Sequence, residues 1–443
     1  MLSLVLLILI VFLIILSTTR WHVHPFLALL GASLLMGVLL GMSPIAVVGK
    51  IVEGFGGTLK SIGIVIAFGT IIGVFLERSG AATTLAEAAL SRLGDRRAPL
   101  AMNLTGFIVS IPVFCDSGFV ILSSLNRAIS RRSGVRLSLL AVALATGLYA
   151  THVFVPPTPG PLAAAATLEA DLGLVLLLGL LVAVPVSAAG LFWAIVIGRH
   201  LSDPKADQPV EKREPKTAEQ PTPSLAPALM PIVLPIFLIA LKSVADYPTH
   251  PLGIGWMARA FGFLGHPVVA LLLGVMLAFS LAGGSNSRKT FVWVNTALQN
   301  AGSIILITGA GGALGYVLRE SGVGESIGKF LIQYRIGVLL PFLVAALLKS
   351  AQGSSTVAII TTAALMSPLL EPLGFAGPMG RALVVVAIGA GAMTVSHLND
   401  SYFWVVAQFS NMEVSTALRG LTLGTLVQGI TGAVMVVLLS LLF

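Results

Sequence analysis

The sequence predicts an all-α polytopic membrane protein with two inverted repeats of about five spans each, two re-entrant hairpins and two broken helices. First, 56% of the 443 residues are hydrophobic and only 10% are charged, whereas soluble domains have about 25% charged residues. Second, apolar runs long enough to cross hydrocarbon recur along the chain. Third, the two halves of the sequence resemble each other. We therefore expect most of the chain to be surrounded by lipid.

The apolar runs set the expected spans, because crossing about 30 Å of hydrocarbon takes roughly 20 residues. The first run, MLSLVLLILIVFLIIL, lacks the basic leader and the small-residue cleavage site of a signal peptide, so we interpret it as a retained span. Spans are expected near residues 2–17, 25–41, 61–77, 137–168, 174–198, 228–243, 268–283, 303–318, 381–410 and 421–443.

One strongly hydrophilic segment, residues 198–224, interrupts these runs. Its prolines and mixed charges are typical of a solvated linker. It divides the chain into an N-terminal membrane repeat, residues 1–197, and a C-terminal membrane repeat, residues 225–443, and we expect the linker to be cytoplasmic.

Charge and cysteine content exclude several classes of function. The net charge is +8, but the basic residues sit in short loops between apolar runs, where the positive-inside rule explains them without a nucleic-acid partner. A single cysteine excludes an internal disulfide, and no Cys/His cluster has the spacing of a zinc site. We expect neither a metal nor another cofactor.

The internal repeat is carried by residue type and spacing together. FGTIIGVFLERSG (68–80) aligns with AGGALGYVLRESG (310–322), and Thr151-His152 falls opposite Ser396-His397 at nearly the same offset. An odd number of spans per half makes the second half enter from the opposite side. Inverted repeats of this kind are a common plan of secondary transporters.

Residues 98–126 are expected to form the first re-entrant hairpin. Arginines flank them on both sides (Arg92, Arg96 and Arg97 before; Arg127, Arg131, Arg132 and Arg136 after), so both flanks should be cytoplasmic. The segment must then enter and leave on one face, with Cys115–Gly118 at or near its tip.

Residues 339–370 are the equivalent segment of the second half, with a tip at KSAQGSST (349–356) and few basic flanking residues. Irregular backbone at such tips survives only where protein or a watery cavity covers it. The start of a helix carries a partial positive charge that suits a carboxylate. Gly118 and Gly353 would allow a tight turn and the close approach of a ligand.

Two further segments interrupt spans. Residues 149–166 hold four prolines within six positions and cannot run as a continuous helix. Residues 393–404 cluster Ser396, His397, Asn399, Asp400 and Ser401 in an apolar context. We expect these segments to be the unwound centres of the fourth and ninth spans.

At these residues the chain resembles the gluconate permease family, the gluconate:H+ symporters of the wider ion transporter superfamily. The resemblance is carried by GFGGTLKSIG, GFVIL after Asp116, THVFVPPTPGPLAAA, GSSTVAIITTAAL and SHLNDSYFW, in the same order along almost the whole chain. It implies a proton-coupled carrier of the bacterial inner membrane for gluconate-like sugar acids or related hydroxy-carboxylates, commonly a homodimer, with elevator-like movement. Gluconate carriers usually have an aromatic residue and a glutamate where this chain has Cys115-Asp116. This difference argues against gluconate as the particular substrate but leaves the class of carrier unchanged.

The candidate site residues lie at the tips and breaks. For substrate binding they are Ser117, Gly118, Thr151, His152, Thr158, Gly353, Ser354, Ser355, Thr356, Ser396, His397 and Asn399, and for proton coupling Asp116, Asp400 and His152. Imidazole titrates near neutral pH, and a buried carboxyl is able to carry a proton.

Each candidate also has a structural interpretation. Asp116 would cap a helix N-terminus, and Asp400 would pair with His397 or cap the second half of its broken span. The Ser and Thr hydroxyls would form hydrogen bonds with backbone groups of their own helix. Lys349 would either reach for the membrane surface or bind a carboxylate.

The polar breaks favour a carrier that takes up a small organic anion together with H+. Sodium coupling, or a D-serine-type amino acid as substrate, is the alternative, because unwound carbonyls and hydroxyls also bind Na+. A membrane-embedded hydrolase is disfavoured, since neither G-x-S-x-G nor H-E-x-x-H is present.

Overall fold

The computed structural model describes residues 2–198, 201, 223–245, 255–282, 287–322, 337–398 and 400–442, and this part of the chain is helical, without strands. The first half forms α1 (Leu2–Thr19), α2 (Pro25–Leu39), α3 (Pro44–Arg78), α4 (Ala81–Leu93), α5 (Ala98–Val109), α6 (Cys115–Ser133), α7 (Leu137–Phe154), α8 (Pro159–Thr167) and α9 (Leu172–Gly198). The second half forms α10 (Leu225–Ala245), α11 (Trp256–Leu264), α12 (Pro267–Phe279), α13 (Ser287–Glu320), α15 (Leu339–Gln352), α16 (Ser355–Met366), α17 (Pro378–Met393), α18 (Ser401–Phe409), α19 (Val414–Ala417) and α20 (Leu423–Ser440). Most of the hydrophilic segment 198–224 lies outside the described residues.

Five helical stretches of the described chain are long and apolar enough to cross a membrane: Leu137–Thr167, Leu172–Gly198, Leu225–Lys242, Arg288–Glu320 and Val414–Ser440. Two bent helix pairs bring the number to seven if each is one span. The span expected at 25–41 and three arms of the expected hairpins form apolar helices of 10–17 residues, too short for a span by the same measure: Pro25–Leu39, Ala98–Val109, Leu339–Ala351 and Ser355–Leu369. The fourth arm, α6, has 19 residues but is not apolar enough to be counted as a span.

The two longest helices, α3 and α13, pack against each other along much of their length. Both begin earlier than the apolar runs 61–77 and 303–318 predicted, at Pro44 and Ser287. At the start of α3, Ser43 accepts a hydrogen bond from the backbone N–H of Ala46, and a proline follows at the first helical position, the usual chemistry of a helix start. The polar stretch GFGGTLKSIG is therefore helical.

Four segments have the order helix, short break, helix. The first tip (residues 110–118) includes the end of α5, a non-helical stretch at 111–114 and the start of α6; the second tip (349–356) joins α15 to α16. The first break (155–158) separates α7 from α8 at the prolines, and the second break (394–400) separates α17 from α18. Gly353 ends α15 with φ +82°, a left-handed conformation that favours glycine.

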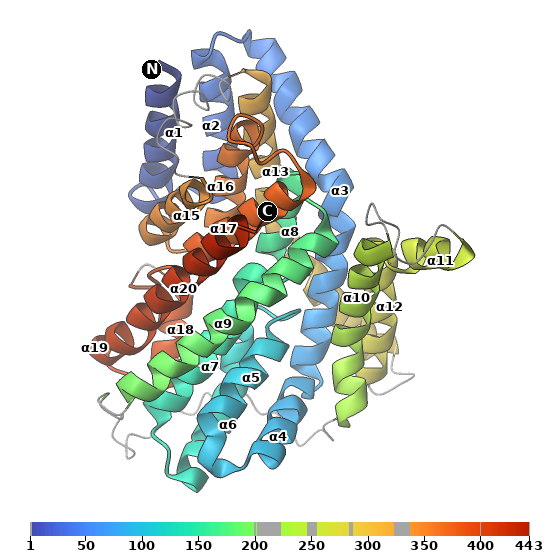
Figure 1. Ribbon diagram of the computed structural model, residues 1–443, viewed down its shortest axis with the longest axis vertical. Coiled ribbons are helices and arrows are strands. Elements are labelled where there is room, and N and C mark those ends of the chain that lie inside the picture. The colour runs from blue at the N-terminus through green and yellow to red at the C-terminus, as the bar shows by residue number, and fades with distance from the viewer. Residues whose placement is uncertain are drawn as a thin grey trace.

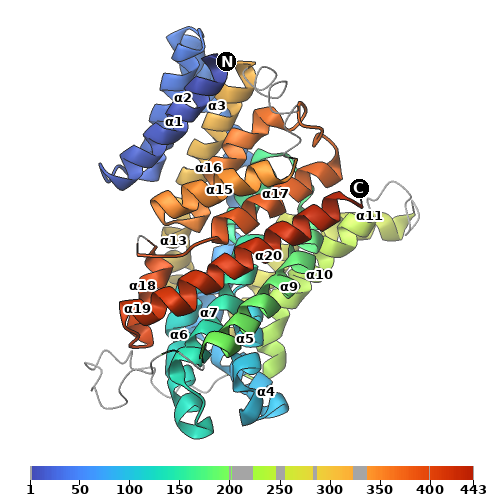
Figure 2. The ribbon, with the colours of Figure 1, turned by 60° about the vertical axis from the view of Figure 1, so that its left-hand side comes forward.

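The two tips belong to helix pairs at different ends of the molecule. Figure 1 shows α4, α5 and α6 gathered at one end, with α15 and α16 toward the other, and Figure 2 keeps this separation. Helix α6 packs on α18, and α16 packs on α8, so each second arm contacts the broken helix of the other half of the chain. Helices α9 and α20 lie side by side in front of α7 (Figure 2).

Glycines on α3 and α13 bring these long helices against the tips and breaks. A Cβ added at Gly73 would lie 2.5 Å from the carbonyl oxygen of Pro112 in the first tip, and one at Gly69 would lie 3.1 Å from that of Pro157. On α13, Cβ atoms at Gly311 and Gly315 would meet Ile360 and Ala364 of α16. The two glycine pairs that align in the sequence therefore both lie in close contacts, but the first pair meets the first break and the first tip whereas the second pair meets the arm α16.

Candidate functional site

A buried ion pair joins the second tip to the second break. The ammonium of Lys349, near the end of α15, lies 2.5 Å from Oδ2 of Asp400, and the two side chains are 0% and 5% exposed. Lys349 also donates to the carbonyl oxygen of Gly353 at 2.6 Å. Asp400 accepts from the hydroxyl of Ser396, and its Oδ1 accepts from the backbone N–H of Tyr402 at 3.0 Å, which caps α18. Such a pair persists in a dry interior only with this kind of supporting hydrogen bonds.

Helix α20 and the turn before it hold the backbone of the second break. Thr425 Oγ1 accepts from the N–H of Ser396 at 2.9 Å, and Thr422 Oγ1 donates to the carbonyl of the same residue at 2.6 Å. The preceding Val395 has φ +56°, which is costly for a β-branched residue and typical of functional sites. His397 Nε2 lies 3.0 Å from the carbonyl oxygen of Ser350 in the second tip. The second break is thus held by hydrogen bonds from Thr422 and Thr425, by the contact of His397 with the second tip, and by the Lys349–Asp400 pair.

Helix α7 connects the two tips. The hydroxyls of Tyr149 and Ser355 are 2.6 Å apart and share a hydrogen bond. One turn further along α7, the ring of His152 stacks with that of Tyr149, with centroids 6.4 Å apart and planes at 14°. His152 also lies 6.0 Å, centroid to centroid, from Phe114 in the first tip. A continuous set of side chains therefore runs from the first tip through α7 to the second.

Two polar atoms in this region are buried and have no hydrogen-bond partner among the described residues: Asp116 Oδ1 and His152 Nδ1. Buried polar atoms are nearly always satisfied by protein, water or ligand. Both are therefore available to a bound molecule.

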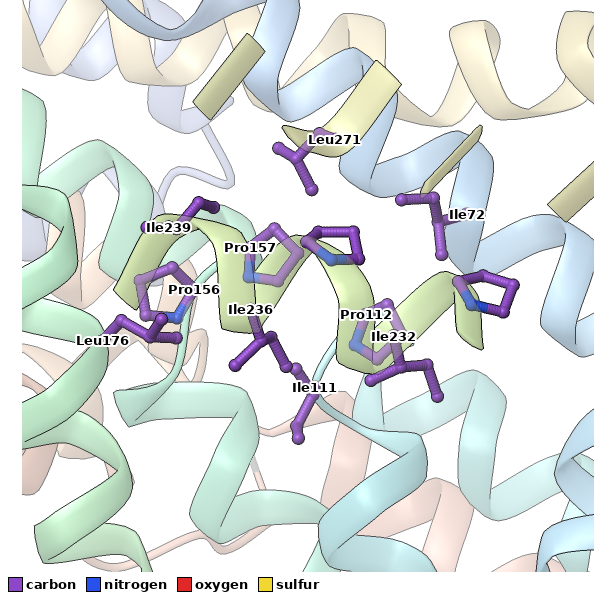
Figure 3. A pocket seen from close by; sticks show the side chains of 12 residues that line it. Ile72, Ile111, Pro112, Pro156, Pro157, Leu176, Ile232, Ile236, Ile239 and Leu271 are labelled. Atoms are coloured by element: carbon purple, nitrogen blue, oxygen red, sulfur yellow. The ribbon is translucent and has the colours of Figure 1, made fainter. Parts of the chain in front are cut away.

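Apolar side chains line the seam between α10 and both the first tip and the first break. Figure 3 shows Pro112 of the first tip and Pro156 and Pro157 of the first break facing Ile232 and Ile236 of α10. The cavity between them is only about 10 Å³, at the lower limit for one water molecule. A polar solute therefore has no room to enter along this seam.

A family model of the GntP family permeases matches residues 2–442. The chain belongs to this family. Among its relatives are a gluconate permease of Pseudomonas aeruginosa (38% identity, 96% of this chain and 94% of the relative) and a low-affinity gluconate transporter of Escherichia coli K12 (32%, 96% and 95%). The D-serine transporter DsdX of the same strain is 33% identical over 97% of this chain and 96% of the relative.

Two solved transporter structures share the fold of this GntP permease. The YdaH transporter of Alcanivorax borkumensis matches with a TM-score of 0.70 and 14% identity over 95% of this chain and 99% of that one. MtrF of Neisseria gonorrhoeae matches with a TM-score of 0.70 and 16% identity over 95% and 96%. The permease is therefore a multi-pass membrane protein, and its relatives are named as permeases and transporters rather than enzymes.

The structure brings some predicted site residues of the permease together and leaves others apart. Ser355, Ser396, Asp400 and His152 contribute to the connected region described above, and His397 borders it. Ser117 and Thr356 are half-buried at the two tips. Asn399 lies outside the described residues.

Other predicted residues have local structural contacts. Thr151 donates to the carbonyl oxygen of Phe107 on α5 at 2.9 Å, and Thr158 to that of Val155 within its own break at 2.6 Å. Ser354 accepts from the N–H of Val357 and caps α16, as the structural interpretation predicted. Gly118 is helical and allows close packing, since an added Cβ would lie 2.7 Å from Leu148, so the expected tight turn is wrong for this glycine.

Two capping and pairing interpretations need correction. Asp116 is not the N-cap of α6, which is Phe114; Asp116 sits in the first turn, where the helix dipole favours an acid. Asp400 does cap α18, but its ionic partner is Lys349 and not His397. His152 lies in the last turn of α7 whereas His397 lies in the second break, so the two histidines differ in their positions relative to the helix ends.

Sequence reasoning missed Tyr149, Thr422 and Thr425, and it left two roles open for Lys349, reaching for the membrane surface or binding a carboxylate. For Lys349 there was a signal: a lysine inside an apolar run at a hairpin tip needs an anion. Tyr149 gave none, because a tyrosine in an apolar helix is also a common packing residue.

Proposed function

We propose that this permease is a secondary transporter that imports a small hydroxy-carboxylate of the gluconate type together with a proton. The observation that carries the proposal is the fully buried Lys349, held with Asp400 between the second tip and the second break. A cation enclosed by hydroxyls is what a carboxylate with hydroxyl groups requires. Membership of a family with gluconate-transporting relatives supports the same substrate class.

The groups around Lys349 suit the remaining part of such a substrate. Tyr149 and Ser355 supply hydroxyls that donate and accept, and His152 and Asp116 supply the unpartnered atoms described above. The N-termini of α6 and α16 add partial positive charge. Together they offer one cationic partner for the carboxylate and several hydrogen-bond partners for hydroxyls.

The proposed movement is of the elevator type, with the two halves arranged as inverted repeats. The helix pairs α5–α6 and α15–α16 act as re-entrant hairpins, which the short lengths of α5, α15 and α16 and the crossed packing of α6 on α18 and α16 on α8 support. Together with the broken helices they form the moving body, which includes the site. Helices α3 and α13 belong to the fixed scaffold, and their glycines give the body a surface without protruding side chains.

The surroundings of the carrier follow from its apolar exterior. Large side chains such as Phe192 (68% exposed) and Phe291 (72%) point outward and need lipid or a second subunit to cover them. We place the protein in the bacterial inner membrane, in line with its bacterial relatives, as a homodimer with segment 198–224 in the cytoplasm.

D-serine is the second candidate substrate. The free Oδ1 of Asp116 would accept from the ammonium of a zwitterion whose carboxylate binds Lys349, and DsdX is a relative. A sugar acid has no ammonium, so substitution of Asp116 by Asn distinguishes the two: it would impair D-serine binding more than gluconate binding.

Purified protein in liposomes tests the function directly. Labelled gluconate, other sugar acids, small hydroxy acids and D-serine are offered under an inward proton gradient, an inward sodium gradient or neither. The proposal predicts accumulation of a hydroxy-carboxylate under the proton gradient and its loss with a protonophore. Accumulation that depends on sodium and ignores the protonophore would contradict proton coupling, and no accumulation of any of these acids would contradict the substrate class.

A further inference from the structure

We infer that Lys349 is the carboxylate-binding residue and that Asp400 takes the substrate's place in the empty carrier, so that substrate binds only when Asp400 has received a proton. The inference rests on the proposed function and gives its coupling a mechanism. Lys349 would exchange one anionic partner for another, and Asp400 would be neutral whenever the substrate is bound.

The contacts of Lys349 allow this exchange. An ammonium has three N–H donors, and the structure uses one for Gly353 and one for Asp400 Oδ2. The hydrogen bond to the carbonyl oxygen of Gly353 holds the Lys349 ammonium at the second tip after Asp400 has been protonated and no longer pairs with it. A substrate carboxylate then has two donors available, the released one and the third.

The contacts of Asp400 allow it to hold the proton without moving. Its Oδ1 is occupied by the N–H of Tyr402, whereas Oδ2 faces both Lys349 and the hydroxyl of Ser396. A proton on Oδ2 removes the acceptor of Lys349 and makes Asp400 a donor to Ser396, whose hydroxyl is able to accept as well as donate. The cap of α18 remains intact in both states.

The charges around the pair make the exchange obligatory. Asp400 is within electrostatic range of Cys115 and Asp116 on α6, Tyr149 and His152 on α7 and Tyr402 on α18; Lys349 faces it from α15, and His397 lies on its own break. A buried cation left without its anion is strongly unfavourable. Protonated Asp400 therefore requires the substrate carboxylate, and the loaded pair carries the same net charge as the empty one.

Among the described residues, the first half of the chain has no buried ion pair that corresponds to Lys349–Asp400. The last turn of α5, the counterpart of α15, has no basic residue, and Asp116 has an unpartnered oxygen instead of an ion pair. Asp116→Asn is therefore the comparison for coupling alone: it removes a carboxylate of the proposed site at the other tip and leaves Lys349 and Asp400 in place.

The test uses reconstituted carrier with gluconate and compares exchange without a gradient, accumulation under a proton gradient, and affinity as a function of pH. In the unmodified protein, affinity for gluconate should weaken as the pH rises, by up to about tenfold per pH unit, because one proton binds with each substrate. Asp400→Asn should keep exchange, lose accumulation and lose the pH dependence of affinity. Asp116→Asn should keep accumulation under the proton gradient and the pH dependence of affinity, whatever it does to the affinity itself. Lys349→Gln should weaken binding by on the order of a hundredfold at every pH.

The outcomes separate this inference from the proposed function. If the unmodified protein accumulates gluconate with protons and Asp400→Asn still does so, or if Asp116→Asn alone abolishes coupling, the inference is overturned while the function stands. If the unmodified protein exchanges neither gluconate nor any other screened acid, both are overturned.

Should Asp400→Asn be unstable alone, gluconate should raise its melting temperature more than it raises that of the unmodified protein, because the substrate carboxylate replaces the missing charge. A smaller effect overturns the inference.

Discussion

Tyr149 shows how a single residue ties the two halves of the molecule to one site. Its hydroxyl bonds Ser355 at the second tip, and its ring lies against His152 and Tyr402. In the proposed mode of binding, a substrate hydroxyl between the tips would meet this phenol. Tyr149 is thus both a structural link and a donor in the proposed site.

Tyr149→Phe should weaken substrate affinity, since a hydrogen bond of this kind contributes about 1 kcal/mol, or about fivefold in binding. Tyr402→Phe is the matched control, because that buried hydroxyl donates at 2.8 Å to the carbonyl oxygen of Ala145 within the helix bundle. It should lower thermal stability with little change in affinity. Equal losses of affinity in both variants, measured by titration of the purified protein, would argue against a role of Tyr149 in binding.

At the scale of elements, the breaks and tips could be predicted from sequence because their causes are local. Pro156 and Pro157 follow the end of α7, Pro159 begins α8, and Gly353 ends α15. The Lys349–Asp400 pair could not be predicted, because its members are 51 positions apart in the sequence. Nothing local shows which of the other charged residues each of them will contact. The early starts of α3 and α13 were missed because polar and glycine-rich stretches there resemble loops, although packing of the two helices on each other keeps them helical.

Cysteine labelling tests whether α5 and α6 form a re-entrant hairpin. With Cys115 replaced by Ala, Arg97→Cys and Arg131→Cys place single thiols at exposed positions before α5 and near the end of α6. Both should react with an impermeant maleimide from the cytoplasmic side only. Reaction from opposite sides would mean that the segment crosses the membrane.

The glycine contacts between α3 and the first tip make a second prediction at this scale. Gly73→Ala adds a Cβ that would lie 2.5 Å from the Pro112 carbonyl oxygen. At this distance α3 and the backbone of the first tip have to move away from each other. Thermal stability and transport rate should both fall. Gly56→Ala in the same helix meets nothing within 4 Å and should be neutral or slightly stabilising, since Ala favours helix over Gly by up to about 1 kcal/mol. Identical behaviour of the two variants would remove the packing argument.

At the scale of the whole molecule, Glu169 connects the proposed scaffold with the proposed moving body. It lies between α8 and α9 and pairs with Arg319 at the end of α13 (2.7 Å) and with Arg381 at the start of α17 (3.4 Å). The hydrogen bond from Arg319, aided by the charge of Arg381, lowers the pKa of Glu169 below its ordinary value. The ion pairs therefore favour the arrangement seen here.

Glu169→Gln should lower the melting temperature at neutral pH and have less effect in acid. A carboxyl with a lowered pKa adds stability above its unfolded-state pKa, and that stability is lost as the pH falls through the folded-state value. The difference between variant and unmodified protein should therefore close on acidification, and it should shrink in high salt. A difference that is independent of pH would show that the ion pairs are not its source.

The central claim is that one proton enters with each substrate carboxylate, and luminal pH measured during uptake tests it most directly. Liposomes containing the permease and a trapped pH dye receive gluconate outside, with the membrane potential clamped. The account predicts luminal acidification in step with uptake, one proton per carboxylate, at a rate that does not change with the clamped potential. Uptake without acidification, or acidification that requires sodium, would contradict it.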